Sequence, residues 1–221
     1  MPARNITIDQ VLIGQWADDA SSLRHNVQLV AMVVGFGLLY GAAMGTFSGL
    51  WGPRLLQVLY SGLKVPMLLL VTFLVALPSF WVLNQLLGLS ADFPRVLRGL
   101  VATQASLTVV LASLCPFTAL WYASSSDYGH AILFNGAMFA VASLTAQWRL
   151  RRYYRPLVQR NPRHRWMQRL WLLIYCFVGI QMGWTLRPFI GDPGSQIQFL
   201  REGALSNAYV VVGRLLLGLV R

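Results

Sequence analysis

Acidic side chains and recognisable catalytic motifs are scarce in this chain. Only 7 of its 221 residues are Asp or Glu, and charged residues of both signs make up 11% of it. The two cysteines are not spaced as C-x-x-C, which argues against a disulfide framework or a redox motif. The three histidines are isolated in the sequence, so we expect no metal site. Because H-E-x-x-H, G-x-S-x-G and phosphate-loop motifs are also missing, we expect no catalytic residues and no cofactor.

Long apolar runs are abundant instead. Hydrophobic residues make up 56% of the chain, and five segments reach about the 20 residues that a helix needs to cross a bilayer. The predicted spans are residues 27–49, 65–89, 99–122, 130–148 and 170–186. These runs predict an all-α integral membrane protein, a bundle of five transmembrane helices with short interfacial helices.

The two termini are expected to lie at the membrane surface. Within residues 1–26, Ile8, Val11, Leu12 and Trp16 stand at helical spacing, which predicts an amphipathic segment. The bundle occupies residues 27–188. Residues 189–221 are expected to form an interfacial loop and an amphipathic or re-entrant helix, because Arg214 divides an apolar tail that is short for a crossing. A sixth span is the alternative for this tail.

Positive charge is concentrated in residues 149–169, which hold eight of the 18 basic residues and no acid. By the positive-inside rule this predicted loop lies in the cytoplasm, and so does the N-terminus. The loop is either a topology determinant only or also a contact for anionic lipid headgroups or an acidic partner. No nucleic-acid-binding module accompanies it. The eight residues are Arg149, Arg151, Arg152, Arg155, Arg160, Arg163, Arg165 and Arg169.

Glycine recurs at every fourth position from residue 37 to residue 49. In lipid, small residues at this spacing let two helix backbones approach closely, which is how membrane helices associate. Gly37, Gly41, Gly45 and Gly49 are therefore predicted to form one packing face of the first span. The partner is either another helix of this chain, which we favour, or a second copy of the protein.

The predicted spans contain no ionisable residue in mid-membrane, where proton-coupled or ion-driven transporters usually carry one. Lys64 falls at the edge of its predicted span, and the polar residues within spans are uncharged. A solute path past Gln104 and Gln181 remains an alternative. Kinks are expected where prolines interrupt the second and third spans, at Pro66, Pro78 and Pro116.

The segment after the fifth span carries a dense set of polar and aromatic residues near one membrane surface. Pro188 ends the helix, a turn-rich stretch follows, and Arg187 and Asp192 are close enough in sequence to pair. We interpret the set as a rigid interfacial cap, with a ligand or partner site as the alternative. Its members are Trp184, Arg187, Pro188, Asp192, Asp127 and His130, and Arg201 and Glu202 fall on the same predicted face.

Two strings carry a family resemblance. The L-K-V-P string at residues 63–66 and the W-x-L-R-P-F-x-G string at residues 184–191 resemble those of uncharacterised bacterial multipass membrane proteins, which are loosely similar to Yip1-type five-span proteins. This resemblance covers about residues 49–194. It implies a cytoplasmic N-terminus and a membrane-organising or adaptor role, and it supplies no catalytic residue.

Together these features favour a non-catalytic scaffold or accessory subunit of the bacterial inner membrane that binds lipids, a protein partner or a second copy of itself. A channel or transporter through the bundle is the first alternative. An enzyme acting on lipid headgroups near Arg187 and Asp192 is the second.

Overall fold

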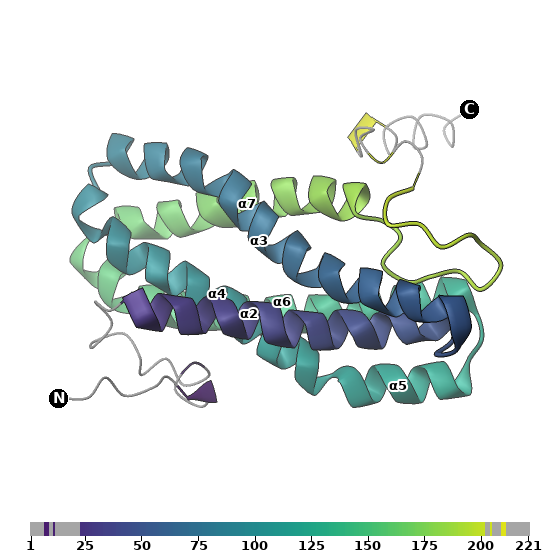
Figure 1. Cartoon of the computed structure of the whole chain (residues 1–221). Coiled ribbons are helices and arrows are strands. Elements are labelled where there is room, and N and C mark those ends of the chain that lie inside the picture. The colour runs from purple at the N-terminus through teal and green to yellow at the C-terminus, as the bar shows by residue number, and fades with distance from the viewer. Residues whose placement is uncertain (1–6, 9–10, 12–22, 202–203, 205–208, 211–221) are drawn as a thin grey trace.

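The computed structural model describes residues 7–8, 11, 23–201, 204 and 209–210, and within them it contains helices and no strand (Figure 1). The α-helices are α2 (Leu23–Gly45), α3 (Leu55–Leu86), α4 (Phe93–Ser113), α5 (Cys115–Ser124), α6 (Tyr128–Arg160) and α7 (Arg163–Thr185). Short 3-10 turns, η1 (Thr46–Ser48), η2 (Gly52–Arg54) and η3 (Ser90–Asp92), connect some of them.

Four helical segments are long and apolar enough to cross a membrane. They are Arg24–Ser48, Gly52–Leu86, Ser90–Ser124, which joins α4 and α5, and Tyr128–Arg160. The remaining helix, α7, has 23 residues, begins with a basic turn and packs along α3. The predicted all-α membrane bundle is therefore confirmed.

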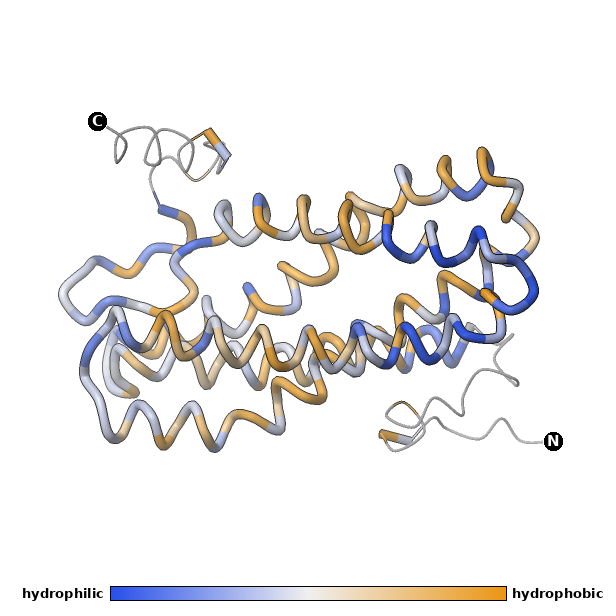
Figure 2. The backbone as a smooth tube through the Cα atoms, turned by 180° about the vertical axis from the view of Figure 1, so that it is seen from behind, coloured by the Kyte–Doolittle hydropathy of each residue, from blue (hydrophilic) through white to orange (hydrophobic). Residues whose placement is uncertain are grey.

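The helices run up and down, so the connections gather at two ends of the bundle (Figure 1). We call the end with residues 87–92 and 161–162 the basic end, and the end with residues 46–54, 125–127 and 186–201 the cavity end. Figure 2 shows that hydrophilic residues gather around the α6–α7 turn at the basic end, whereas apolar residues dominate the helices between the two ends. The connections alternate between the two ends along the chain, as the predicted succession of spans requires.

The helix boundaries differ from the prediction in two regions, at the start of α3 and at the turn between α6 and α7. Helix α3 begins at Leu55 rather than near residue 65, which brings Lys64 inside the helix. The predicted basic loop of residues 149–169 is wrong, because α6 continues to Arg160, α7 begins at Arg163 and only two residues separate them. Arginine is a good helix former, so the helices extend past the apolar runs. Pro162 disfavours helical backbone at Asn161 and so separates α6 from α7.

Three of the four striped glycines lie where α2 crosses α3. A Cβ atom at Gly41 would stand 2.3 Å from the carbonyl oxygen of Ser61, and one at Gly45 would stand 2.6 Å from Cα of Val58. At Gly37 it would meet the ring of Pro66 at 3.3 Å. These approaches are too close for a side chain at Gly41 or Gly45, so the glycines bring two helices of one chain together.

Gly49 does not belong to that packing face. Helix α2 ends at Gly45, and Gly49 follows η1 with a φ of 114°. This left-handed backbone favours glycine and reverses the chain toward α3. The four-residue spacing therefore predicted one helical position too many, because a turn glycine occurred in register with the stripe.

The proline positions affect the helices differently. The third span breaks between Ser113 and Cys115, just before Pro116, as the predicted kink requires. Pro66 and Pro78 both lie inside a continuous α3.

Near the basic end Phe80 and Trp171 pack edge to face, with ring centres 4.8 Å apart, which joins α3 to α7.

The predicted terminal helices lie largely outside the described residues. Of the amphipathic segment only Thr7, Ile8 and Val11 are described; Val11 is buried, and its carbonyl oxygen accepts a hydrogen bond from Arg149. The C-terminal interfacial helix or sixth span falls on residues that are mostly outside the described part of the chain.

Candidate functional site

A cavity of about 760 Å³ lies at the cavity end, between α3, α6 and the loop of residues 187–201. The part of its wall that lies deeper in the bundle is apolar and is formed by Met44, Leu68, Ile132 and Phe139. At 1.5 Å per residue, the distance from Tyr128 to Phe139 corresponds to about 16 Å of depth along α6. The rim is polar, with Arg54, Gln57, Arg187, Asp192, Ser195, Gln196, Gln198 and Arg201, whereas the buried Asn135 lies deeper along α6, between Ile132 and Phe139.

The cavity opens sideways between two helices that hardly touch. Helix α3 packs mainly on α2 and α7, whereas α6 packs mainly on α4. The side chain of Ile132 on the cavity wall is 48% exposed, and Gly136 beside it is exposed as well. A Cβ atom built at Gly136 meets nothing within 4 Å. In a membrane, this opening faces lipid.

Three consecutive carbonyl groups of the loop are each held by a side chain from the bundle. Lys64 Nζ donates to Pro188 O and Ser61 Oγ donates to Phe189 O. Tyr128 Oη donates to Ile190 O at 3.1 Å. Because these donors come from α3 and α6, the loop is fixed across the mouth of the cavity.

Lys64 corrects the expectation that no charge is buried within a span. The residue is fully buried in α3, and its ammonium lies 5.1 Å from the centre of the Phe199 ring. Burying a charge in the membrane is costly unless donors are satisfied, which the Pro188 carbonyl does in part. Sequence reasoning missed it because the apolar run was taken to begin at residue 65. The L-K-V-P string itself was the available signal.

Arg187 and Arg201 both stack on Trp184. Their guanidinium carbons lie 3.4 Å and 4.6 Å from the centre of the indole ring. Such cation–π contacts orient a planar guanidinium over the ring face. Two positive groups are thereby held against one indole at the rim of the cavity, and each lines the cavity.

The expected ion pair of Arg187 with Asp192 is not formed. The Asp192 carboxylate accepts from the backbone N–H of Gly194 at 3.0 Å and from Ser195 Oγ at 2.8 Å. These two bonds, followed by the charge of Arg54, lower the pKa of Asp192 from its ordinary value. Arg54 holds the same turn through the carbonyl oxygens of residues 192, 193 and 195. The turn satisfies its own carboxylate, which leaves Arg187 to the indole.

Asp127 and His130 stand apart from the cavity, at the exposed start of α6. Asp127 caps the helix by accepting from the backbone N–H of His130 at 2.8 Å, and the His130 imidazole lies 3.2 Å from the same carboxylate. The backbone hydrogen bond is the main reason why the pKa of Asp127 is lowered. The predicted cap thus divides into two parts. One part is the cavity rim, where Trp184 supports Arg187 and Arg201. The other is the helix cap formed by Asp127 and His130.

At the basic end most of the arginines are exposed. Arg149 is half-buried, whereas the other seven of the set have exposed side chains. Arg163 Nη1 donates to the carbonyl oxygen of Leu87 at 3.2 Å, and Arg169 lies 5.3 Å from the centre of the Trp166 ring. Charges on this surface can contact an anionic leaflet without desolvation.

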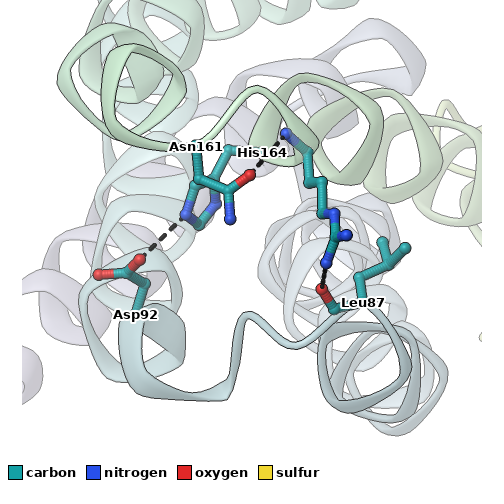
Figure 3. A network of polar contacts seen from close by, with 5 residues as sticks. Leu87, Asp92, Asn161 and His164 are labelled. Atoms are coloured by element: carbon teal, nitrogen blue, oxygen red, sulfur yellow. Dashed lines mark hydrogen bonds and ion pairs between the residues drawn. The ribbon is translucent and has the colours of Figure 1, made fainter.

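One buried polar contact joins the two turns of the basic end. His164, which is fully buried, lies with Nε2 3.0 Å from Asp92 Oδ2, and Figure 3 shows these side chains pointing toward each other. Asn161 Oδ1 accepts from the backbone N–H of Arg163 in the adjoining turn. The contact links the start of α7 to the start of α4.

Metal-binding clusters are absent from the described residues, in which no three His, Cys, Asp or Glu side chains gather. Glu202, which the sequence places on the same face as Arg201, lies outside the described part of the chain. No protein-family model, curated protein or solved structure matches this chain. The resemblance to bacterial Yip1-like proteins therefore stays a prediction.

Proposed function

We propose that this chain is a non-catalytic accessory protein of the bacterial inner membrane that holds a lipid molecule in its cavity. The observation that carries the proposal is the two-part lining of the cavity, with an apolar wall along α3 and α6 and a polar rim at the membrane surface. This order matches the acyl and headgroup parts of a lipid. The exposed side chain of Ile132 supports entry of an acyl chain from the bilayer.

The contacts of the loop support a binding role rather than a chemical one. Its carbonyl groups are engaged by Lys64, Ser61 and Tyr128, so these donors hold a preformed rim. A preformed cavity of several hundred Å³ with a few convergent polar groups is typical of small-molecule binding sites. The adaptor role implied by the family resemblance agrees with this proposal.

Gly136→Leu tests the proposal, because the new side chain has room to grow into the cavity. Gly183→Leu is the matched control: Gly183 also has open space around a built Cβ, but it does not line the cavity. Both variants are purified in mild detergent and weighed intact by native mass spectrometry. We expect one retained lipid on the wild type and on Gly183→Leu, and none on Gly136→Leu.

Two results would contradict this proposal. In one, the wild type and both variants retain the same lipids, so that the cavity is not the site. In the other, the wild type carries a stoichiometric protein that Gly136→Leu releases, so that the cavity holds a partner segment instead of a lipid.

A channel or transporter has less support from the described residues. Gln104 is buried and accepts a hydrogen bond from Tyr175 at 3.0 Å, and neither Gln104 nor Gln181 lines the cavity. An enzyme acting on lipid headgroups would need free catalytic groups, whereas the Asp192 carboxylate is engaged within its own turn.

We also propose that the basic end faces the cytoplasm, as the positive-inside rule favours. Single cysteines at Arg160 and Ser126, in a chain whose two native cysteines are replaced by alanine, test this orientation. A membrane-impermeant thiol reagent applied to intact spheroplasts should label Ser126→Cys and spare Arg160→Cys. The reverse pattern would invert the proposed topology.

A further inference from the structure

Two arginines at the rim of the cavity share one aromatic platform, and neither has an acidic partner among the described residues. Arg187 and Arg201 lie 3.4 Å and 4.6 Å from the Trp184 ring centre. The ion pairs of His130 with Asp127 and of His164 with Asp92 lie away from this rim. Among the described residues the acid that lines the cavity is Asp192, and its carboxylate accepts hydrogen bonds from its own turn.

Both guanidinium groups also keep donor atoms that no protein atom accepts. Arg187 Nη2 and Arg201 Nε are buried from solvent and have no hydrogen-bond partner. A buried donor without an acceptor is costly, and a charged one more so. Burial, and then the neighbouring charge of Arg201, lower the pKa of Arg187 from its ordinary value. An arginine remains protonated at neutral pH all the same.

The surroundings add to the positive charge. Lys64 is held on Pro188 O, the residue next to Arg187, and Arg54 lines the same cavity. If this end of the bundle faces away from the cytoplasm, the positive-inside rule does not account for these cations. Both arginines line the cavity, so an anion there would offset their mutual repulsion and accept hydrogen bonds from the guanidinium N–H groups that face it.

We propose that Arg187 and Arg201, stacked on Trp184, bind the phosphate group of an anionic lipid headgroup. The inference rests on the proposed function and names the class of lipid. Guanidinium groups match phosphate oxygens with paired donors, and the partial burial of both arginines strengthens such charge-assisted bonds. The lipid source follows from the cavity itself, whose apolar wall continues from the rim toward the interior of the membrane.

A competition between two lipids tests the proposal. The delipidated protein is offered equal amounts of phosphatidylglycerol and phosphatidylcholine of the same chain length, and the lipid retained after gentle activation is identified by native mass spectrometry. We expect the wild type to prefer phosphatidylglycerol by about tenfold, equivalent to about 1.4 kcal/mol. The Arg187→Gln/Arg201→Gln variant should still hold one lipid but lose the preference.

Matched variants separate charge, position and folding. Arg151→Gln/Arg152→Gln removes the same charge from exposed sites at the basic end and should keep the preference. Arg187→Lys/Arg201→Lys keeps the charge without the planar fork and should retain a preference of a few fold. These lysine variants preserve the test even if the glutamine variant fails to fold.

The outcomes distinguish this inference from the proposed function. If the wild type holds a lipid that Gly136→Leu loses but does not prefer phosphatidylglycerol, whose phosphate charge no choline cation offsets, selection of an anionic headgroup is wrong and the lipid cavity stands. If no lipid is retained at all, both are wrong. An equal loss of preference in Arg151→Gln/Arg152→Gln would place headgroup selection at the basic end and overturn the inference.

A second arm separates a lipid phosphate from a free one. Lipid-stripped protein is titrated with millimolar inorganic phosphate and, separately, with phosphatidylglycerol, while its thermal unfolding is followed. We expect phosphatidylglycerol to raise the unfolding midpoint and inorganic phosphate to raise it far less. Equal protection by inorganic phosphate would show that the site binds the free ion, and it would overturn the lipid assignment.

Discussion

The two ends of the bundle carry positive charge in opposite ways. At the basic end seven arginine side chains are exposed to water or to an anionic surface. At the cavity end there are fewer cations, but Lys64 is buried, and Arg187 and Arg201 are fixed on an indole. The number of charges therefore predicts topology, whereas their burial and fixed geometry indicate a binding site.

Packing at the cavity end depends on glycine, and breaking it should give the largest effect. Gly41→Leu places a side chain against backbone atoms of Ser61 and Gly62. The two helices must move apart to make room for it. We expect a loss of about 3 kcal/mol, the upper range for overpacking, read as a lower unfolding midpoint in detergent. Gly35→Leu, where a built Cβ meets nothing within 4 Å, is the control and should behave as wild type. Equal effects of the two substitutions would mean that α2 does not pack through its glycines.

Removing one buried cation should matter more than removing one exposed cation. Lys64→Met leaves the carbonyl oxygen of Pro188 without its donor. An unsatisfied buried acceptor costs about 1–3 kcal/mol, from which relief of the buried charge subtracts. We expect a net loss of about 1 kcal/mol for Lys64→Met, and less than about 0.5 kcal/mol for Arg160→Met at the basic end. Chemical denaturation of both variants checks the difference, and identical midpoints would refute it.

Salt should separate the lipid contacts of the two ends. Raising the ionic strength from about 0.1 M to 1 M shortens the Debye length from about 10 Å to 3 Å, which weakens exposed charge contacts most. Any anionic-lipid preference left in Arg187→Gln/Arg201→Gln should then disappear. The preference of Arg151→Gln/Arg152→Gln, which depends on the cavity, should survive. Lipid competition at both salt concentrations is the measurement, and an equal loss in the two variants would contradict the contrast between the ends.

A smaller, pH-dependent effect is expected at Asp127. Its pKa is lowered in the folded protein, chiefly by the backbone N–H of His130, so the folded state favours the carboxylate. This contribution is fully present above the ordinary pKa of an aspartate and is lost as the pH falls through the lowered pKa. Asp127→Asn should therefore reduce the pH dependence of the unfolding midpoint in acid. Circular dichroism melts between pH 7 and pH 3 check this, and parallel curves would exclude the contribution.

Much of the fold could be predicted because apolar runs of bilayer length mark membrane helices. The end of α6 at Arg160 could not, since arginines, which favour helix, extend it beyond its apolar part. The start of α3 at Leu55 was misplaced because Lys64 was taken to end the apolar run, although most of residues 55–63 are apolar. The sequence also brought Arg187 and Trp184 to one place, at the end of the fifth predicted span, although α7 itself ends at Thr185. It could not show that Arg201 stacks on the same indole, because that contact depends on how the loop returns to the bundle. The burial of Lys64 was missed because the residue was taken as the edge of a span, whereas it lies inside α3.

The account depends most directly on what fills the cavity. A high-resolution structure of the protein in nanodiscs of phosphatidylglycerol, with a rigid binder to increase its size, would show this. We predict phosphate density within hydrogen-bonding distance of the guanidinium groups of Arg187 and Arg201, with an acyl chain running between α3 and α6. A cavity without lipid, in which a carboxylate of the chain itself pairs with both guanidinium groups, would contradict the account.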